Sequence, residues 1–329
     1  MKCTNKYKII IPIVMSLLLL NGCKARTDVA DAYDVYATSD SYALTQSESK
    51  ELPELLATDL CVGGMENSLP EEGVDASVAQ TAAVFSVDDQ KITYAQNIYQ
   101  KMYPASTTKI LTAYVALKYG KLDDMLTVSN EAISSLMMGS SICGLKPGDQ
   151  LTLDQALYGL MLCSGNDAAN VIAEYISGST DKFAELMNQE AQALGATQSH
   201  FVNPHGLPDD NHYTTAYDLY LIFNAAIQND DFVKYISTKK YSTSYTDING
   251  NTVDQVWFNT NGYLKGTYKA PENITVVGGK TGTTDKAGNC LVLYSKNSSG
   301  KPYISIVLKG NSKRELYTLM TELLTKYSN

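Results

Sequence analysis

Segments rich in strand-forming residues lie at both ends of the periodic part of this chain, with a helical block between them. The first is "TAAVFSVDDQKITYAQN", a hairpin pattern around Asp88-Asp89; the later ones are "KKYSTSYT", "ITVVGGKTGTT", "NCLVLYSK" and "PYISIVLKG". One sheet needs strands from both ends, so the helical block of roughly 100 residues is predicted to be an insertion. The expected fold class is α/β (α+β): an antiparallel sheet flanked by helices, with an inserted mainly helical subdomain.

The helical segments differ in how deeply they are expected to lie. The segment 105–119, "ASTTKILTAYVALKY", is apolar on nearly every face after Lys109, which is typical of a fully buried helix. Four more helical patterns follow, and Ser164-Gly165 separates the first of them from the second. A last helix begins with a capping box, Ser312 and Glu315, and is expected to pack on the sheet. Its apolar stripe comprises Leu316, Leu319, Met320, Leu323 and Leu324.

The N-terminus has the pattern of an export signal. Lys2, Lys6 and Lys8 precede an apolar run over 9–20 that is too short to span a bilayer comfortably, and "LNGC" ending at Cys23 resembles the lipobox of bacterial lipoproteins. We therefore expect a lipoprotein signal peptide at 1–22, a lipidated Cys23, and a protein on the extracytoplasmic face of the membrane. The alternative is a simple signal or anchor with an incidental cysteine. Residues 23–75, poor in periodicity, are predicted to be a flexible tether to a domain at 76–329.

Charge and cysteine content limit the classes of partner. A net charge of -9 argues against nucleic-acid binding, which needs clustered basic residues. The chain has two arginines, Arg26 and Arg314, so a bidentate grip on a carboxylate in the folded part falls to Arg314. Four cysteines beyond the signal are widely spaced, and the sequence leaves open three disulfide pairings or free thiols. They are Cys61, Cys143, Cys163 and Cys290.

Ser106 and Lys109 can meet on one face at the start of the buried helix. A serine hydroxyl needs a base to become a nucleophile, and a lysine serves as one when burial or a neighbouring cation keeps its amine neutral. The apolar run after Lys109 provides such burial. Alone, this spacing is more often a capped helix with a solvated lysine.

Two further short motifs make the pattern specific. Ser164-Gly165-Asn166 lies in a break between helices, and Lys280-Thr281-Gly282 follows a strand whose glycines allow another chain segment to approach closely. The order of S-x-x-K, S-x-N and K-T-G is shared by penicillin-binding proteins and serine β-lactamases. Over residues 76–325, including "FVNPHGLP" and "GGKTGTTDKAG", the chain resembles the low-molecular-mass D-alanyl-D-alanine carboxypeptidases of the S11 peptidase family.

The resemblance implies a role for each matching residue. Ser106 corresponds to the acylated nucleophile and Lys109 to its base. Ser164 corresponds to a hydroxyl that relays a proton to the leaving amine, Asn166 to a ligand of the substrate amide, and Lys280 to a support for the relay and the substrate carboxylate. The expected fold is that of the β-lactamases and transpeptidases, and no cofactor or metal is implied.

The same resemblance implies how substrate is held. Backbone N–H groups of Ser106 and Thr283 correspond to an oxyanion hole, and the strand with Thr281, Gly282 and Thr283 would pair with the substrate peptide. The two threonine hydroxyls and Arg314 would bind a terminal carboxylate. The expected partners are peptidoglycan stem peptides ending in D-Ala-D-Ala, β-lactam antibiotics that acylate Ser106, and the membrane through an N-terminal lipid.

Three alternative functions remain possible from the sequence. His200, His205 and His212 share a loop with Asp209 and Asp210, but their spacing gives no HExxH helix for a metallopeptidase; the loop is expected to shape the cleft instead. A serine β-lactamase shares the acylation step, but its class A members also need a glutamate that activates the deacylating water, and the corresponding loop, "SHFVNPHGLP", contains none. A non-catalytic β-lactam-sensing wall lipoprotein would keep the cleft without turnover.

Overall fold

The computed structural model describes residues 60–62, 67–68 and 70–328. The predicted signal peptide, Cys23 and residues 24–59 of the predicted tether lie outside these ranges. Within the described ranges, none of the helices combines the length and apolar character needed to cross a bilayer.

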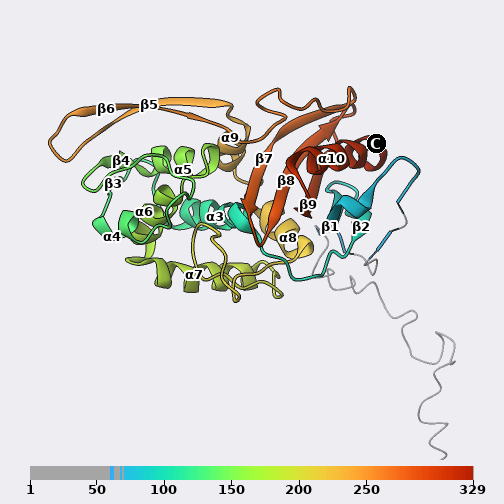
Figure 1. The fold of residues 1–329 in the computed structure, drawn as a ribbon, viewed down its shortest axis with the longest axis horizontal. Helices are drawn as coiled ribbons and strands as arrows, with labels where there is room; N and C mark the ends of the chain where they lie inside the picture. The colour runs from blue at the N-terminus through green and yellow to red at the C-terminus, as the bar shows by residue number, and fades with distance from the viewer. Residues whose placement is uncertain (1–59, 63–66, 69, 329) are drawn as a thin grey trace, which may run out of the picture. The chain divides into compact units, whose positions relative to one another are not determined.

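A five-stranded antiparallel sheet joins the two ends of the described chain (Figure 1). The N-terminal hairpin pairs with the C-terminal strands because β1 lies directly against β9. This pairing confirms that the helical segment is an insertion into one sheet. The strand order is β2 (Lys91–Gln96), β1 (Ala79–Ser86), β9 (Pro302–Gly310), β8 (Gly288–Asn297) and β7 (Ile274–Thr284).

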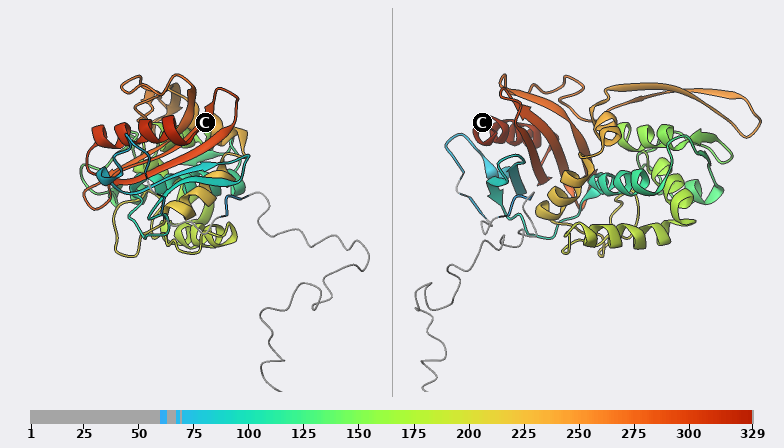
Figure 2. Two further views of the ribbon diagram at one scale, coloured as in Figure 1. Left: turned by 90° about the vertical axis from the view of Figure 1, so that its right-hand side faces the viewer. Right: turned by 180° about the vertical axis from the view of Figure 1, so that it is seen from behind.

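The sheet separates two hydrophobic clusters. Ala82 and Val84 of β1 belong to the cluster under α10 (Lys313–Tyr327), whereas Ala83 and Phe85 face the inserted helices. Alternate residues of a strand point to opposite faces, so both faces of the sheet are covered. Figure 2 shows α10 on one side of the sheet and α8 with the remaining helices on the other.

The helical block is built around one central helix, α3 (Lys109–Tyr119), which packs against five others, α5 to α9. Most of α3 is fully buried, as its all-round apolar sequence predicts. A short 3-10 helix, η3 (Ala105–Thr108), leads into it. The surrounding helices are α4 (Asn130–Ser134), α5 (Leu153–Leu162), α6 (Asn166–Ser177), α7 (Thr180–Ala193), α8 (Ala216–Ala226) and α9 (Asp230–Ser237).

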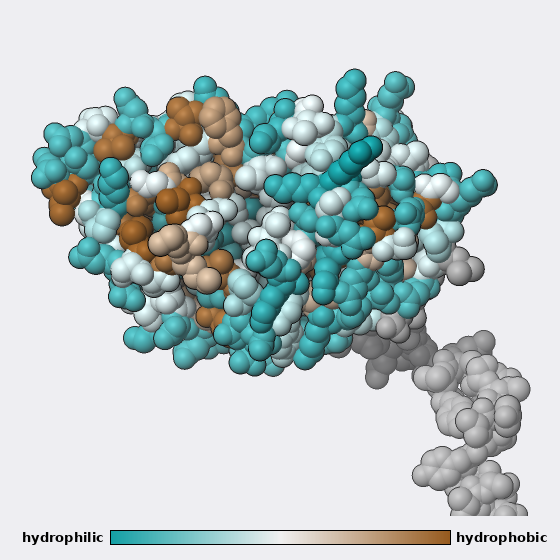
Figure 3. All heavy atoms as spheres, viewed as in Figure 1, coloured by the Kyte–Doolittle hydropathy of each residue, from teal (hydrophilic) through white to brown (hydrophobic). Residues whose placement is uncertain are grey.

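A second, four-stranded sheet corrects one expectation. The segment "KKYSTSYT" forms β5 (Lys240–Thr246), which pairs with β4 and β6 and not with the main sheet. The sheet comprises β3 (Met125–Thr127), β4 (Gln150–Thr152), β5 and β6 (Thr252–Phe258). Strand propensity alone does not state which sheet a strand joins. The β5–β6 hairpin leaves Val256 and Phe258 exposed. On the face in Figure 3, hydrophobic residues gather mainly at the end of the molecule where the β5–β6 hairpin and α4 lie.

The packed domain also begins earlier than predicted. A flexible tether over 23–75 is wrong at its C-terminal end, because the Cys61 side chain is fully buried and its N–H donates to the Tyr220 hydroxyl at 2.8 Å. A short 3-10 helix, η2 (Ala76–Val78), then leads into β1. Single long-range contacts of this kind leave no periodicity in the sequence from which they could be predicted.

Ser312 caps α10 as expected, with its Oγ accepting the N–H of Glu315 at 3.2 Å. The reciprocal bond differs from a capping box, because the Glu315 carboxylate accepts from the Ser312 hydroxyl at 2.7 Å instead of from its backbone N–H.

Candidate active site

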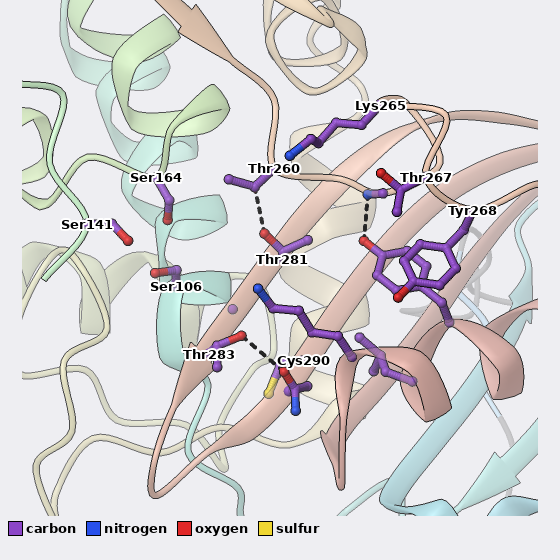
Figure 4. A pocket seen from close by; sticks show the side chains of 16 residues that line it. Ser106, Ser141, Ser164, Thr260, Lys265, Thr267, Tyr268, Thr281, Thr283 and Cys290 are labelled. Carbon is purple, nitrogen blue, oxygen red and sulfur yellow. Dashed lines mark hydrogen bonds between the residues drawn. The ribbon is translucent and has the colours of Figure 1, made fainter.

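Ser106 and Lys109 lie where η3 passes into α3. Lys109 Nζ lies 3.1 Å from Ser106 Oγ, as the three-residue spacing predicts. Ser106 is half-buried, whereas Lys109 is fully buried. The hydroxyls of Ser106, Ser141 and Ser164 point into one space (Figure 4). The pair therefore joins a reachable hydroxyl to an amine that bulk water does not reach.

The Lys109 amine has two further partners. Its Nζ lies 2.7 Å from Asn166 Oδ1 and 2.8 Å from the carbonyl oxygen of His205. Burial, together with the charge of nearby Lys280, holds the pKa of Lys109 well below its usual range. A neutral amine donates two N–H groups to Asn166 and His205 and keeps a lone pair. That lone pair can accept the Ser106 hydroxyl proton.

Ser164 lies in the turn between α5 and α6, in a left-handed conformation with φ of 61°. Lys280 of β7 donates from Nζ to Ser164 Oγ at 2.9 Å and to its neighbour's carbonyl oxygen, that of Thr281, at 3.0 Å. Burial lowers the pKa of Lys280 to about 7. A second amine with an accessible neutral form thus lies beside a second hydroxyl.

The strand β7 borders the nucleophile because Gly282 has no side chain. A Cβ there would lie 3.0 Å from Ser106 N and from the Pro104 carbonyl oxygen. Close approach at this glycine agrees with the prediction from the sequence. Thr281 and Thr283 lie beside Gly282 on the cleft wall, and the Thr281 hydroxyl bonds that of Thr260 at 2.7 Å (Figure 4).

Two clefts meet at Ser106. One, of about 290 Å³, is lined by β7, the loop 260–268 and the start of α10, and its lining includes Lys265 and Lys313 but no carboxylate. The other, of about 390 Å³, is lined by residues 137–141, 205–208 and 283–286, with Met137 and Met138 exposed at its edge. An extended ligand could therefore cross the nucleophile, with an anionic end favoured in the first cleft.

A family model described as D-alanyl-D-alanine carboxypeptidase, Peptidase S11, matches residues 69–312. The chain belongs to the D-alanyl-D-alanine carboxypeptidase family. It is 35% identical over 256 residues to the D-alanyl-D-alanine carboxypeptidase DacF of Bacillus subtilis, covering 76% of this chain and 62% of DacF. It is also 35% identical over 261 residues to DacA of Escherichia coli K12, covering 77% of this chain and 61% of DacA.

Solved structures agree with this family assignment. The Streptomyces K15 DD-transpeptidase superposes with a TM-score of 0.71 and 30% identity, covering 78% of this chain and 98% of that one. A D-alanyl-D-alanine carboxypeptidase from Mycobacterium tuberculosis superposes with a TM-score of 0.67 and 29% identity, over 79% and 92%. The expected β-lactamase/transpeptidase-like fold is thereby confirmed for this member of the carboxypeptidase family.

One residue expected at the carboxypeptidase-like site is not brought into it. Arg314 is exposed and does not line either cleft described above, whereas its neighbour Lys313 lines the first. Lys265, Ser141 and the His205 carbonyl were not anticipated. The loop residues follow no periodic pattern, and a backbone carbonyl carries no signal in the residue type.

The histidine loop packs against the nucleophile helix. His212 Nδ1 accepts the N–H of Val202 at 3.1 Å, so its Nε2–H donates to Thr108 Oγ1 at 2.9 Å. Burial lowers the pKa of His212 to about 4 and that of His205 to about 3. Since residues 205–208 line the second cleft, the loop shapes the site as the sequence predicts.

Proposed function

We propose that this chain is a serine-type D-alanyl-D-alanine carboxypeptidase that removes the terminal D-Ala from peptidoglycan stem peptides. The observation that carries the proposal is the buried Lys109 amine, 3.1 Å from Ser106 Oγ, with Asn166 and His205 available for its N–H groups. The arrangement leaves the amine free to act as a base on that one hydroxyl. The family assignment supplies the substrate class.

The acylation step follows from these contacts. Lys109 takes the Ser106 proton while Oγ attacks the carbonyl carbon of the penultimate D-Ala, with the backbone N–H groups of Ser106 and Thr283 as the proposed oxyanion donors. Ser164, held by Lys280, relays to the leaving nitrogen the proton that Lys109 has taken, so that Lys109 becomes neutral again and Ser164 keeps its hydroxyl. The peptide C–N bond breaks, free D-Ala departs, and the stem remains as an ester on Ser106. Water then hydrolyses the ester and restores the hydroxyl.

Substrate binding has a proposed direction. The terminal carboxylate is placed in the first cleft, where the hydroxyls of Thr281 and Thr283 and the cations Lys265 and Lys313 gather. Asn166 lines the second cleft and is proposed to bind the amide of the acyl portion. Arg314, exposed outside both linings, stays a prediction for carboxylate binding.

A penicillin would acylate Ser106 by the same step, but the resulting ester would be hydrolysed slowly. Residues 205–208 supply a backbone carbonyl to Lys109 and no carboxylate, and the one carboxylate in the lining of the second cleft is Asp285, which lies in the turn after β7 and not in that loop. The proposal therefore favours a β-lactam target over a β-lactamase. Rapid turnover of a chromogenic cephalosporin would contradict it.

The proposal extends to location. We infer export and an anchor through lipidated Cys23, which would keep the domain at the extracytoplasmic face of the membrane near peptidoglycan. The expected change for Cys23→Ala is a move from the membrane to the soluble fraction. Unchanged fractionation would refute the lipid anchor without touching the chemistry.

The decisive experiment combines two readouts on the full chain. Mass spectrometry of a labelled-penicillin adduct should locate the label on Ser106, and a stem pentapeptide should release free D-Ala. Ser106→Ala should abolish both, whereas Ser242→Ala, exposed on β5, should change neither. An adduct at another residue would overturn the mechanism. Penicillin labelling without D-Ala release would favour the non-catalytic sensor.

A further inference from the structure

Two thiols that the proposed mechanism does not use lie in contact beside the site. Cys163 Sγ lies 3.1 Å from Cys143 Sγ. Cys163 Sγ also lies 3.1 Å from the Gly159 carbonyl oxygen. The other two described thiols bond backbone carbonyls: Cys61 Sγ lies 3.3 Å from the Ser86 oxygen and Cys290 Sγ 3.5 Å from that of Ala287. Among the described cysteines, therefore, the structure favours a single link between Cys143 and Cys163, with Cys61 and Cys290 as free thiols.

The Cys143 sulfur is confined by the backbone around it. A Cβ at Gly165 would lie 2.0 Å from Cys143 Sγ, and one at Gly159 would lie 2.6 Å from it. The sulfur thus occupies space left free by Gly159 in α5 and by Gly165 in the turn that follows Cys163. A side chain held in this position cannot rotate far from its neighbouring thiol.

Backbone contacts also hold the two segments together. The Cys143 N–H donates to both carboxylate oxygens of Asp167, at 2.8 and 2.9 Å, and the Asn166 N–H donates to the Ser141 carbonyl oxygen at 2.8 Å. The thiols are therefore positioned by hydrogen bonds that do not depend on a bond between the sulfurs. This preorganisation reduces the rearrangement that disulfide formation requires.

We propose that Cys143 and Cys163 form a disulfide in an oxidising compartment, and that this bond fastens the turn carrying Ser164 to the segment carrying Ser141. Half-buried Cys163 attacks a disulfide reagent, releasing one thiol and leaving a mixed disulfide; Cys143 then attacks the Cys163 sulfur and releases the second thiol. The two cysteines lose two electrons and two protons, and the reagent becomes two thiols. The oxidant is thus any small-molecule or protein disulfide.

The second step of disulfide formation, in which Cys143 attacks the Cys163 sulfur, should depend on pH. Burial raises the pKa of the Cys143 thiol well above its ordinary value, so little thiolate is present at neutral pH. Ring closure should accelerate as the pH rises, while the surrounding hydrogen bonds keep the sulfurs in place. An alkaline incubation is therefore the most sensitive condition for detection.

Peptide mapping tests the pairing without relying on catalysis. The full chain is incubated with glutathione disulfide at about pH 8.5, remaining thiols are alkylated, and the protein is cleaved before aspartates. Asp149 and Asp154 lie between the two cysteines, so cleavage places them in separate peptides. We expect a linked pair of peptides that separates on reduction. Alkylated Cys143 and Cys163, separate glutathione adducts, or links to Cys61 or Cys290 would each overturn the proposal.

Variants test the effect on the turn. Oxidised wild type should unfold roughly 5–10 °C above the reduced form, because the bond closes a loop of about 20 residues. Cys163→Ala and Cys143→Ala should abolish this difference, and Cys61→Ala should keep it. Equal midpoints for cross-linked and reduced wild type would refute the fastening role. The inference rests on the proposed function only for the compartment; a cross-linked protein that releases no D-Ala would contradict that function alone.

Discussion

The carboxamide oxygen of Asn166 lies 2.7 Å from Lys109 Nζ, so the first residue of α6 fixes the amine while also lining the second cleft. The resemblance assigned Asn166 to the substrate amide alone. The contact adds a positioning role. The amide oxygen accepts one N–H of the Lys109 amine, and because it carries no full negative charge it does not favour the ammonium form.

Asn166→Asp tests that distinction. A carboxylate at this distance favours the ammonium form, so the pKa of Lys109 should rise. Since acylation needs the neutral amine, penicillin acylation near neutral pH should fall about 100-fold and partly recover as the pH rises. The measurement is the acylation rate against pH. Asn249→Asp, exposed in the β5–β6 turn, is the matched control; an unshifted profile for Asn166→Asp would remove the positioning role.

A contact can be predicted from the sequence when its two residues lie close together along the chain. The Ser106–Lys109 contact spans three residues on one helical turn and was predictable from spacing. The Lys280–Ser164 contact joins residues 116 positions apart, and only the family resemblance brought them together. Lys265, in an irregular loop, had no pattern to reveal it. The sheet that β5 joins and the burial of Cys61 were missed because each depends on tertiary contacts.

Lys280→Met should change the pH dependence of stability. Burial depresses the pKa of Lys280 to about 7, so below that pH the folded state carries a buried charge, and wild-type stability rises as pH increases toward the unfolded pKa. The methionine variant lacks this pH-dependent contribution to stability. The free energy of unfolding of the variant, relative to that of wild type, should be about 3 kcal/mol more favourable at about pH 6 than at about pH 9, because about two pH units separate pH 9 from the folded pKa.

Denaturant unfolding at both pH values measures this difference. Lys240→Met, exposed on β5, controls for loss of a surface lysine. A constant gap between Lys280→Met and wild type across the range would show that Lys280 remains charged in the folded protein. Independently, the variant should lose D-Ala release because Ser164 loses its amine partner.

Lys313→Ala should weaken recognition of a terminal carboxylate more than Arg314→Ala does. Lys313 lines the carboxylate-free first cleft, whereas Arg314 is exposed outside it. An exposed cation contributes modestly, so we expect about a 3–10-fold rise in KM for a peptide ending in D-Ala-D-Ala. The same peptide with a C-terminal amide should not distinguish Lys313→Ala from wild type. A larger effect from Arg314→Ala would support carboxylate binding by the arginine instead.

Gly206→Ala should impair acylation because the glycine lets the 205–208 segment touch the nucleophile's helix. Its φ is 87°, and a Cβ would lie 1.8 Å from the Ala105 carbonyl oxygen, one residue before Ser106. The segment must move, and with it the His205 carbonyl that accepts from Lys109. We expect penicillin acylation to fall at least about tenfold.

Gly178→Ala separates this crowding from backbone strain. Gly178 ends α6 with a similar φ of 80°, yet a Cβ there would meet nothing within 4 Å. Both variants should therefore lose about 1 kcal/mol of stability from the left-handed conformation, but only Gly206→Ala should also lose acylation. Acylation rates are to be compared well below the unfolding midpoint of each variant. Equal rates in the two variants would mean that the 205–208 segment does not position the Lys109 amine.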